Sequence, residues 1–343
     1  MQFGYALLTA QRPSSSEQGY ETVYDETIRL ADLAEEHGFD AVWTSEHHFF
    51  DDGYSPSVLP LSAAIAQATD TVTVGTGIAL APLYHPIRLA EDAATVDLIS
   101  GGRFRLGVAN GYMDREFEVF DSPKSERAKR VVEAIEICRR AWQPGTFSFD
   151  GDIYQFQDLR VEPTPAQEGG PPIWLGGTSD PAVERAIRRA DGHIGIVYYD
   201  EAMSYGGSFA EVRDNVDRMD DRVDEDFTYA LMQYTHVHED RERAWDQLRP
   251  SLVYSRRKYA EHAADRDASE WDFDSMSDER LEQLRAGALV GTPEDIIEQL
   301  REYEQAIPGE LHVLARMWQP LLSFEEHAAA IRLFGEEVIP EFR

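Results

Sequence analysis

Cysteine and long apolar runs are nearly absent from this chain of 343 residues. Its single cysteine, Cys138, excludes a disulfide framework and argues against a thiolate metal cluster. No apolar run approaches the length of a membrane-spanning helix. The segment MQFGYALLTAQ also lacks the charged and apolar regions of a signal peptide. We therefore expect a cytoplasmic protein that has no membrane segment.

Basic residues are also scarce in this chain. The chain has 32 basic and 64 acidic residues, a net charge of -32, and only three of the basic residues are lysines. The acids are spread along the chain, and such a surface stays soluble where concentrated ions screen its self-repulsion. We expect a protein from a high-salt cytoplasm, the alternative being an ordinary acidic enzyme. Nucleic acid and anionic membranes are poor partners for either.

Strand-like and helix-like stretches alternate along the chain, and repeated units of this length predict a parallel sheet with right-handed crossovers. The predicted strands fall at 2–8, 40–44, 72–80, 103–108, 173–176, 193–198, 228–237 and 311–315. The predicted helices fall at 21–36, 57–68, 87–98, 125–141, 181–190 and 293–305, with a last one from Phe324.

One decorated (β/α)8 TIM barrel over residues 1–343 is the economical interpretation, because no interdomain linker is evident. Residues 146–172, a hairpin around Asp-Gly and a loop rich in proline and glycine, are predicted as an insertion. The stretch 260–285 is polar and weakly patterned, which is typical of a lid or mobile loop.

The segment GFDAVWTSEHHF is the most informative in the chain. A buried strand there delivers Glu46, His47 and His48 to its C-terminal end, where TIM barrels place their chemistry. Adjacent histidines in extended chain point to opposite sides, so they rarely share a metal ion. We predict that His47 is an acid/base or hydrogen-bond donor supported by its two neighbours. A structural histidine with satisfied ring nitrogens is the alternative.

The segment GGTSDP, which begins at Gly176, predicts an anion site. Two glycines let the backbone approach a ligand, and Ser179 or Asp180 can cap the helix that the proline begins. Free N–H groups at a helix start attract phosphate, and Arg127 could add a bidentate contact. A plain helix cap without a ligand is the alternative.

Nucleotide-binding fingerprints are missing. No Walker A loop is present, and Gly75-Thr76-Gly77 lacks the third glycine and the following helix of a dinucleotide-binding motif. This argues against a nicotinamide Rossmann domain.

Several stretches together resemble bacterial luciferase and its flavin-dependent monooxygenase relatives. They are FGYALLT, GFDAVWTSEHHF, VGTGIALAPLYHPIRLAED, GGRFRLGVANGYMDREFEVF, PPIWLGGTS and VGTPEDIIEQL. Their ordered combination is specific for this superfamily, although not for one reaction. The resemblance implies a TIM-like barrel that binds reduced flavin at the C-terminal strand ends.

The resemblance also implies individual site residues. His47 matches the active-site histidine near the reactive edge of the isoalloxazine, and Gly77-Ile78 matches a non-proline cis peptide that supports the flavin ring. With the residues argued above, the predicted cofactor-binding set is Gly77, Ile78, Asn110, Tyr112, Arg127, Gly177, Thr178 and Ser179, with His47 catalytic and no metal ligand.

The chain departs from the family pattern at two positions. The light-emitting luciferase subunit has a reactive cysteine where Ala109 stands and an arginine where Asn110 stands, so one phosphate partner is lost. A Gly-Ile cis-peptide site is also compatible with deazaflavin-using relatives. The Glu-His-His-Phe sequence after the second strand instead favours FMN.

These observations predict a monooxygenase that uses reduced FMN and O2 on a small apolar organic substrate through a flavin hydroperoxide protected in a dry pocket. A separate flavin reductase is a possible partner. The alternatives are a deazaflavin-dependent hydride-transfer enzyme on the same barrel and a non-catalytic flavin-binding protein. Tyr198, Tyr199, Met317 and Trp318 are predicted as pocket walls.

Helices 57–68 and 87–98 are predicted to form the face of a homodimer, because relatives dimerise there. Buried core helices would produce the same apolar pattern.

Overall fold

The computed structural model describes residues 1–197, 214–217, 223, 226–263, 267–307 and 310–343. Its strands are β1 Gln2–Leu8, β2 Ala41–Thr44, β3 Thr73–Thr76, β4 Phe104–Val108, β5 Phe147–Asp150, β6 Gln155–Leu159, β7 Ile173–Gly176, β8 Gly192–Ile196, β9 Thr228–Val237, β10 Leu289–Gly291 and β11 Leu311–Arg316. Its helices are α1 Tyr20–Glu36, α2 Val58–Ala68, α3 Pro86–Ser100, α4 Asp114–Val119, α5 Arg127–Ala141, α6 Asp180–Arg189, α8 Arg241–His262, α9 Asp278–Ala286, α10 Pro293–Ala306 and α11 Phe324–Leu333. Within these ranges, none of the helices combines the length and apolar character that crossing a membrane requires.

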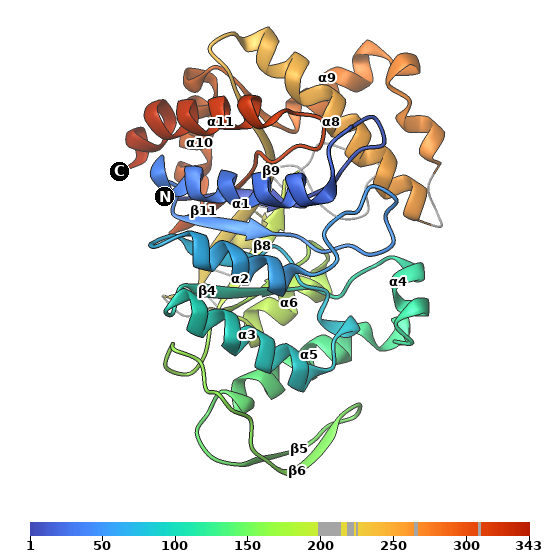
Figure 1. Cartoon of the computed structure of the whole chain (residues 1–343), viewed down its shortest axis with the longest axis vertical. Helices are drawn as coiled ribbons and strands as arrows, with labels where there is room; N and C mark the ends of the chain where they lie inside the picture. The colour runs from blue at the N-terminus through green and yellow to red at the C-terminus, as the bar shows by residue number, and fades with distance from the viewer. Residues whose placement is uncertain (198–213, 218–222, 224–225, 264–266, 308–309) are drawn as a thin grey trace.

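Eight parallel strands close into a barrel. Their order is β1-β2-β3-β4-β7-β8-β9-β11, and β11 pairs back to β1, while β10 pairs with β9 outside the ring. The surrounding helices cover the outside of the strands (Figure 1). The predicted TIM barrel is therefore confirmed.

Large aromatic side chains fill the barrel interior. The Trp43 and Trp174 rings stack with their centroids 5.0 Å apart, and both are at most 1% exposed. Gly75 makes room for this pair, because a Cβ there would lie 2.3 Å from the Trp43 ring. The barrel is thus a packed core, so a ligand site has to lie at one of its two ends.

The strand predicted at 72–80 is shorter than expected. It ends at Thr76, because a cis peptide bond between Gly77 and Ile78 turns the chain out of the sheet. The backbone then returns to the edge of β4, where the Ala79 N–H donates to the Gly107 carbonyl over 2.8 Å. The apolar pattern continues across this bulge, which is why periodicity alone could not locate the end of the strand.

The predicted insertion carries a two-stranded hairpin, β5–β6, which projects from the barrel (Figure 1). Glu133 on α5 holds its turn by accepting hydrogen bonds from the N–H groups of Asp152 at 2.8 Å and Tyr154 at 3.0 Å. This buried carboxylate ties the insertion to the barrel helices.

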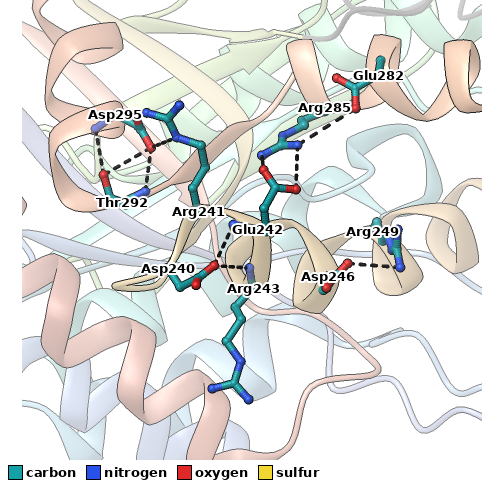
Figure 2. A network of polar contacts seen from close by, with 10 residues as sticks. All are labelled: Asp240, Arg241, Glu242, Arg243, Asp246, Arg249, Glu282, Arg285, Thr292 and Asp295. Atoms are coloured by element: carbon teal, nitrogen blue, oxygen red, sulfur yellow. Dashed lines mark hydrogen bonds and ion pairs between the residues drawn. The ribbon is translucent and has the colours of Figure 1, made fainter.

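The stretch 260–285, predicted as a lid, contains the end of α8, two 3-10 turns and most of α9. An ion pair links α9 to the start of α8, with Arg285 and Glu242 2.9 Å apart, and Arg241 pairs with Asp295 on α10 (Figure 2). Exposed pairs of this kind add little to stability, because water and salt screen the two charges. Closure of this stretch over a ligand stays a prediction.

Glu35, in the last turn of α1, caps the loop that precedes β3. Its carboxylate accepts hydrogen bonds from the N–H groups of Asp70 at 2.9 Å and Val72 at 2.8 Å and from the Thr71 hydroxyl at 2.6 Å. Burial raises the pKa of Glu35, but these hydrogen bonds outweigh it and lower the pKa from 4.5 to about 2. The carboxylate therefore stabilises the fold in its charged form.

We expect Glu35→Ala to lower the free energy of unfolding by about 1–2 kcal/mol at pH 7. Because the folded-state pKa is depressed, this contribution is complete above the unfolded-state pKa of about 4.5 and is lost as pH falls toward 2. Urea unfolding of wild type and variant at pH 7 and pH 3 measures the difference, with Glu36→Ala, an exposed neighbour, as control. A difference that is as large at pH 3 would contradict this assignment.

Candidate active site

A cavity of about 320 Å³ opens at the C-terminal ends of the barrel strands. All nine predicted site residues line it: His47, Gly77, Ile78, Asn110, Tyr112, Arg127, Gly177, Thr178 and Ser179. They come from the segments after β2, β3, β4 and β7 and from the first residue of α5. A second hollow of about 500 Å³, lined by Arg105 and Trp174, lies at the opposite end, where barrels do not place their chemistry.

His47 is held by a buried carboxylate that the sequence analysis missed. Its Nδ1 lies 3.0 Å from Oε1 of Glu116 on α4, and the same oxygen accepts the His48 N–H at 3.0 Å. Glu116 is 1% exposed and His47 is 7% exposed. A carboxylate on Nδ1 makes that nitrogen the proton donor, so Nε2 remains for a group in the cavity.

Aromatic rings surround the His47 imidazole. Phe50, Tyr54, Tyr112 and Tyr259 have ring centroids 5.3, 5.0, 5.7 and 5.4 Å from it. We call these four residues the aromatic box. The box leaves His47 little contact with water, and burial raises the pKa of the Tyr54 phenol. It therefore gives the histidine an apolar, shielded environment.

Helix α8 supplies one wall of the aromatic box. Tyr259 shares a hydrogen bond of 3.2 Å with the Tyr54 hydroxyl, and the Tyr254 hydroxyl donates to Asp52 over 2.8 Å. Lys258 pairs with Asp51 at 2.8 Å. These contacts fasten α8 to the loop after β2, although the two segments are about two hundred residues apart in the sequence.

Glu46, which precedes His47, hydrogen-bonds both to the segment after β2 and to the segment after β3. One oxygen lies 2.8 Å from His48 Nε2, and the other accepts the Leu80 N–H at 3.0 Å and the Tyr84 hydroxyl at 2.9 Å. The Glu-His-His segment is thus tied to the chain just past the Gly77-Ile78 bulge. Among the described residues, no group of three or more histidine, cysteine or acidic side chains is arranged to hold a metal ion.

The predicted phosphate end of the cavity lies where β7 runs into α6. Gly177 has φ +140°, and a Cβ there would lie 2.7 Å from the Ala182 Cβ, so the tight turn requires glycine. Buried His193 donates from Nε2 to the Gly177 carbonyl over 2.6 Å, and burial lowers the pKa of this histidine. Ser179 is the N-cap residue of α6, yet its hydroxyl makes no capping hydrogen bond, which leaves it available to a ligand.

The side chain of Asn110 indicates whether the residues of the cavity suit a flavin. Its Oδ1 is buried and has no hydrogen-bond partner within the described protein, although the residue lines the cavity. A buried amide oxygen without a donor is costly, and a hydroxyl or ring N–H of a bound ligand would satisfy it. A flavin carries both kinds of donor, so the residues present fit the predicted cofactor.

Two of the predicted pocket walls are elsewhere. Met317 and Trp318 are buried in the core between strands and outer helices and do not line the cavity, because the chain has left β11 at that point. Arg316, the last residue of β11, lines it instead. Tyr198 and Tyr199 lie outside the described residues.

Comparison with known proteins identifies the family. Residues 1–308 match the model of the luciferase-like monooxygenases, and the chain belongs to this family. The prediction of an enzyme of the luciferase-like flavin-dependent monooxygenase class is thereby confirmed.

Several individual proteins are similar to the chain. The oxygenase component of a flavin-dependent trigonelline monooxygenase from Acinetobacter baylyi is 27% identical over 98% of this chain and 95% of that protein. An alkanal monooxygenase alpha chain from Photorhabdus laumondii is 31% identical over 55% of this chain and 52% of its own length. An F420-dependent glucose-6-phosphate dehydrogenase from Nakamurella multipartita is 28% identical over 93% of this chain and 92% of that protein.

Solved structures agree with the fold. The monooxygenase RslO1 from Streptomyces bottropensis superposes with a TM-score of 0.85 at 26% identity, covering both chains completely. The oxygenating constituent of 3,6-diketocamphane monooxygenase from Pseudomonas putida, solved in complex with FMN, has a TM-score of 0.76 at 18% identity over 99% of this chain and 98% of that one.

Proposed function

We propose that this protein is the oxygenating component of a monooxygenase that uses reduced FMN and O2 on a small apolar organic substrate. The observation that carries the proposal is that one cavity at the C-terminal strand ends joins all the predicted site residues. One part of it holds a shielded, carboxylate-bound histidine, and another holds an arginine with the start of a helix. The trigonelline relative, named as an oxygenase component, supports a separate reductase as the source of reduced FMN.

Each part of the cavity has a role in this proposal. Arg127, Thr178 and Ser179 hold the phosphate, and the Gly77-Ile78 bulge supports the ring. Bound reduced FMN supplies the electrons that activate O2. His47 holds or moves a proton at Nε2 beside the reacting carbon, and the aromatic box keeps water away.

The cavity walls support an apolar substrate. Leu7, Ile194, Ile196 and Met232 line it together with Tyr259 of the aromatic box. These side chains offer mainly apolar contact, so we expect the substrate to bind through its hydrocarbon surface.

The identity of the cofactor that the protein binds, and how that cofactor reacts with O2, distinguish this proposal from its alternatives. The apoprotein, purified in high salt, is titrated anaerobically with reduced FMN and with a reduced deazaflavin, and each complex is mixed with O2 in a stopped-flow spectrophotometer. We expect reduced FMN to bind and its reaction with O2 to differ in rate and peroxide yield from that of free FMN. Retention of the deazaflavin alone would favour the hydride-transfer enzyme. FMN binding with an unchanged O2 reaction would indicate a non-catalytic flavoprotein.

The net charge predicts an unusual salt dependence of FMN binding. A protein at -32 repels the FMN phosphate at long range, whereas at about 1 M salt the Debye length is about 3 Å and only local contacts survive. We expect FMN affinity to rise with salt while the fold is intact, and riboflavin, which lacks the phosphate, to respond less. A steady fall in FMN affinity with salt would contradict this expectation.

We also propose a homodimer built on α2 and α3. In support, Leu98 and Ile99 at the end of α3 are each 43% exposed, which is more than large apolar side chains usually are. Light scattering in high salt should give twice the mass of the chain. A monomeric mass would rule the dimer out.

A further inference from the structure

Two arginines, Arg127 at the start of α5 and Arg185 on α6, lack a carboxylate partner among the described contacts. Arg130 and Arg139 on α5 and Arg188 on α6 each pair with a carboxylate. Within the described part of the chain, neither Arg127 nor Arg185 makes such a pair; Arg127 donates only to the Lys124 carbonyl at 3.0 Å.

The environment of Arg185 disfavours its own charge. Its Nε is buried and has no hydrogen-bond partner among the described residues. Burial lowers the pKa of Arg185, and the nearby Arg127 guanidinium lowers it further, so the two cations lie close enough to repel each other. A bound anion would replace this repulsion with attraction on both sides and would provide the missing hydrogen-bond acceptor.

Arg185 lies next to the phosphate end of the cavity, although it does not itself line it. It follows Ala182 by three residues on α6, and Ala182 lines the cavity beside Thr178 and Ser179. Residues three apart share a helix face, and long helical side chains lean toward the helix N-terminus. The turn before α6 is itself held by His193 through the Gly177 carbonyl. An anion at this end would therefore meet a fixed loop, a helix start and two guanidinium groups.

We propose that Arg185 is a phosphate-binding residue, and that it clamps a dianionic phosphate monoester together with Arg127 and the start of α6. The inference rests on the proposed function, because it takes FMN as the source of the phosphate. Two arginines match the two charges of a monoester better than the single charge of a phosphodiester.

Paired titrations test this inference. FMN and riboflavin share the isoalloxazine and the ribityl chain and differ only in the phosphate, so their affinity ratio isolates the phosphate contacts. Both are titrated in high salt against wild type, Arg185→Met and Arg185→Lys. Arg189→Met, an exposed site on the same helix, is the control for the change in net charge. We expect Arg185→Met to weaken FMN binding about 10- to 100-fold and to leave riboflavin binding within about twofold. Arg185→Lys should lie between, and the control should match wild type.

The melting temperature of each apoprotein separates a ligand role from a structural one. A structural arginine lowers the melting temperature when removed, whereas loss of a half-buried cation beside another cation should leave it unchanged or raise it. Two results would overturn the inference: an unchanged preference for FMN in Arg185→Met, or equal losses of both flavins with a lower melting temperature. If wild type itself does not prefer FMN to riboflavin, the proposed FMN phosphate site fails and the role of Arg185 fails with it.

Discussion

Replacing His47 with alanine should lower oxygenation about 10²- to 10⁴-fold while FMN affinity stays unchanged. The imidazole lies inside the aromatic box, and its Nδ1 is occupied by Glu116, which leaves Nε2 to exchange a proton with the reacting groups. The predicted phosphate contacts come from other strand ends, so the cofactor should still bind.

The measurement is product formation under single-turnover conditions, with reduced FMN, O2 and an organic substrate that wild type oxygenates. His85→Ala is a matched control, because His85 is exposed and does not line the cavity. Wild-type product yield in His47→Ala would remove this histidine from catalysis. Loss of FMN affinity in the same variant would mean that its role is in binding instead.

The second large effect is expected at Glu116. Glu116→Ala removes the acceptor that fixes both the ring orientation and the tautomer of His47, and we expect oxygenation to fall about 100-fold or more with FMN affinity within about twofold. Glu116→Gln keeps the side-chain shape and one acceptor oxygen but loses the charge, so its defect should be smaller.

Glu118→Gln provides the control on the same short helix, since Glu118 is exposed and pairs only with Arg115 among the described contacts. Product formation and FMN affinity are measured side by side for all three variants. If Glu116→Ala oxygenated at the wild-type rate, the carboxylate would be a structural group without influence on His47. A parallel loss in Glu118→Gln would indicate damage to α4 as a whole.

The parts of the site that the sequence predicted lie directly after strands. His47, Asn110 and Ser179 each follow a buried strand with a clear apolar pattern, and parallel strands in a barrel bring their C-terminal ends together. Arg316 could have been found by the same rule, because it ends β11, one residue past the strand predicted at 311–315.

The parts that the sequence did not reveal depend on packing between distant segments. Glu116 lies in a six-residue helix that also contains Asp114 and Glu118, and no local pattern distinguishes the one carboxylate that turns inward. Tyr259 reaches His47 from α8, more than two hundred residues further along the chain. No periodicity or motif in the sequence predicts either contact, so both could be found only from the three-dimensional structure.

A crystal structure of the FMN complex, grown in high salt, would show directly where the flavin and its phosphate bind. We expect one FMN in the cavity, with its phosphate within hydrogen-bond reach of Ser179 and Arg127 and its ring against the Gly77-Ile78 bulge beside His47. A flavin bound at the opposite end of the barrel, or one whose phosphate faces His47, would contradict it.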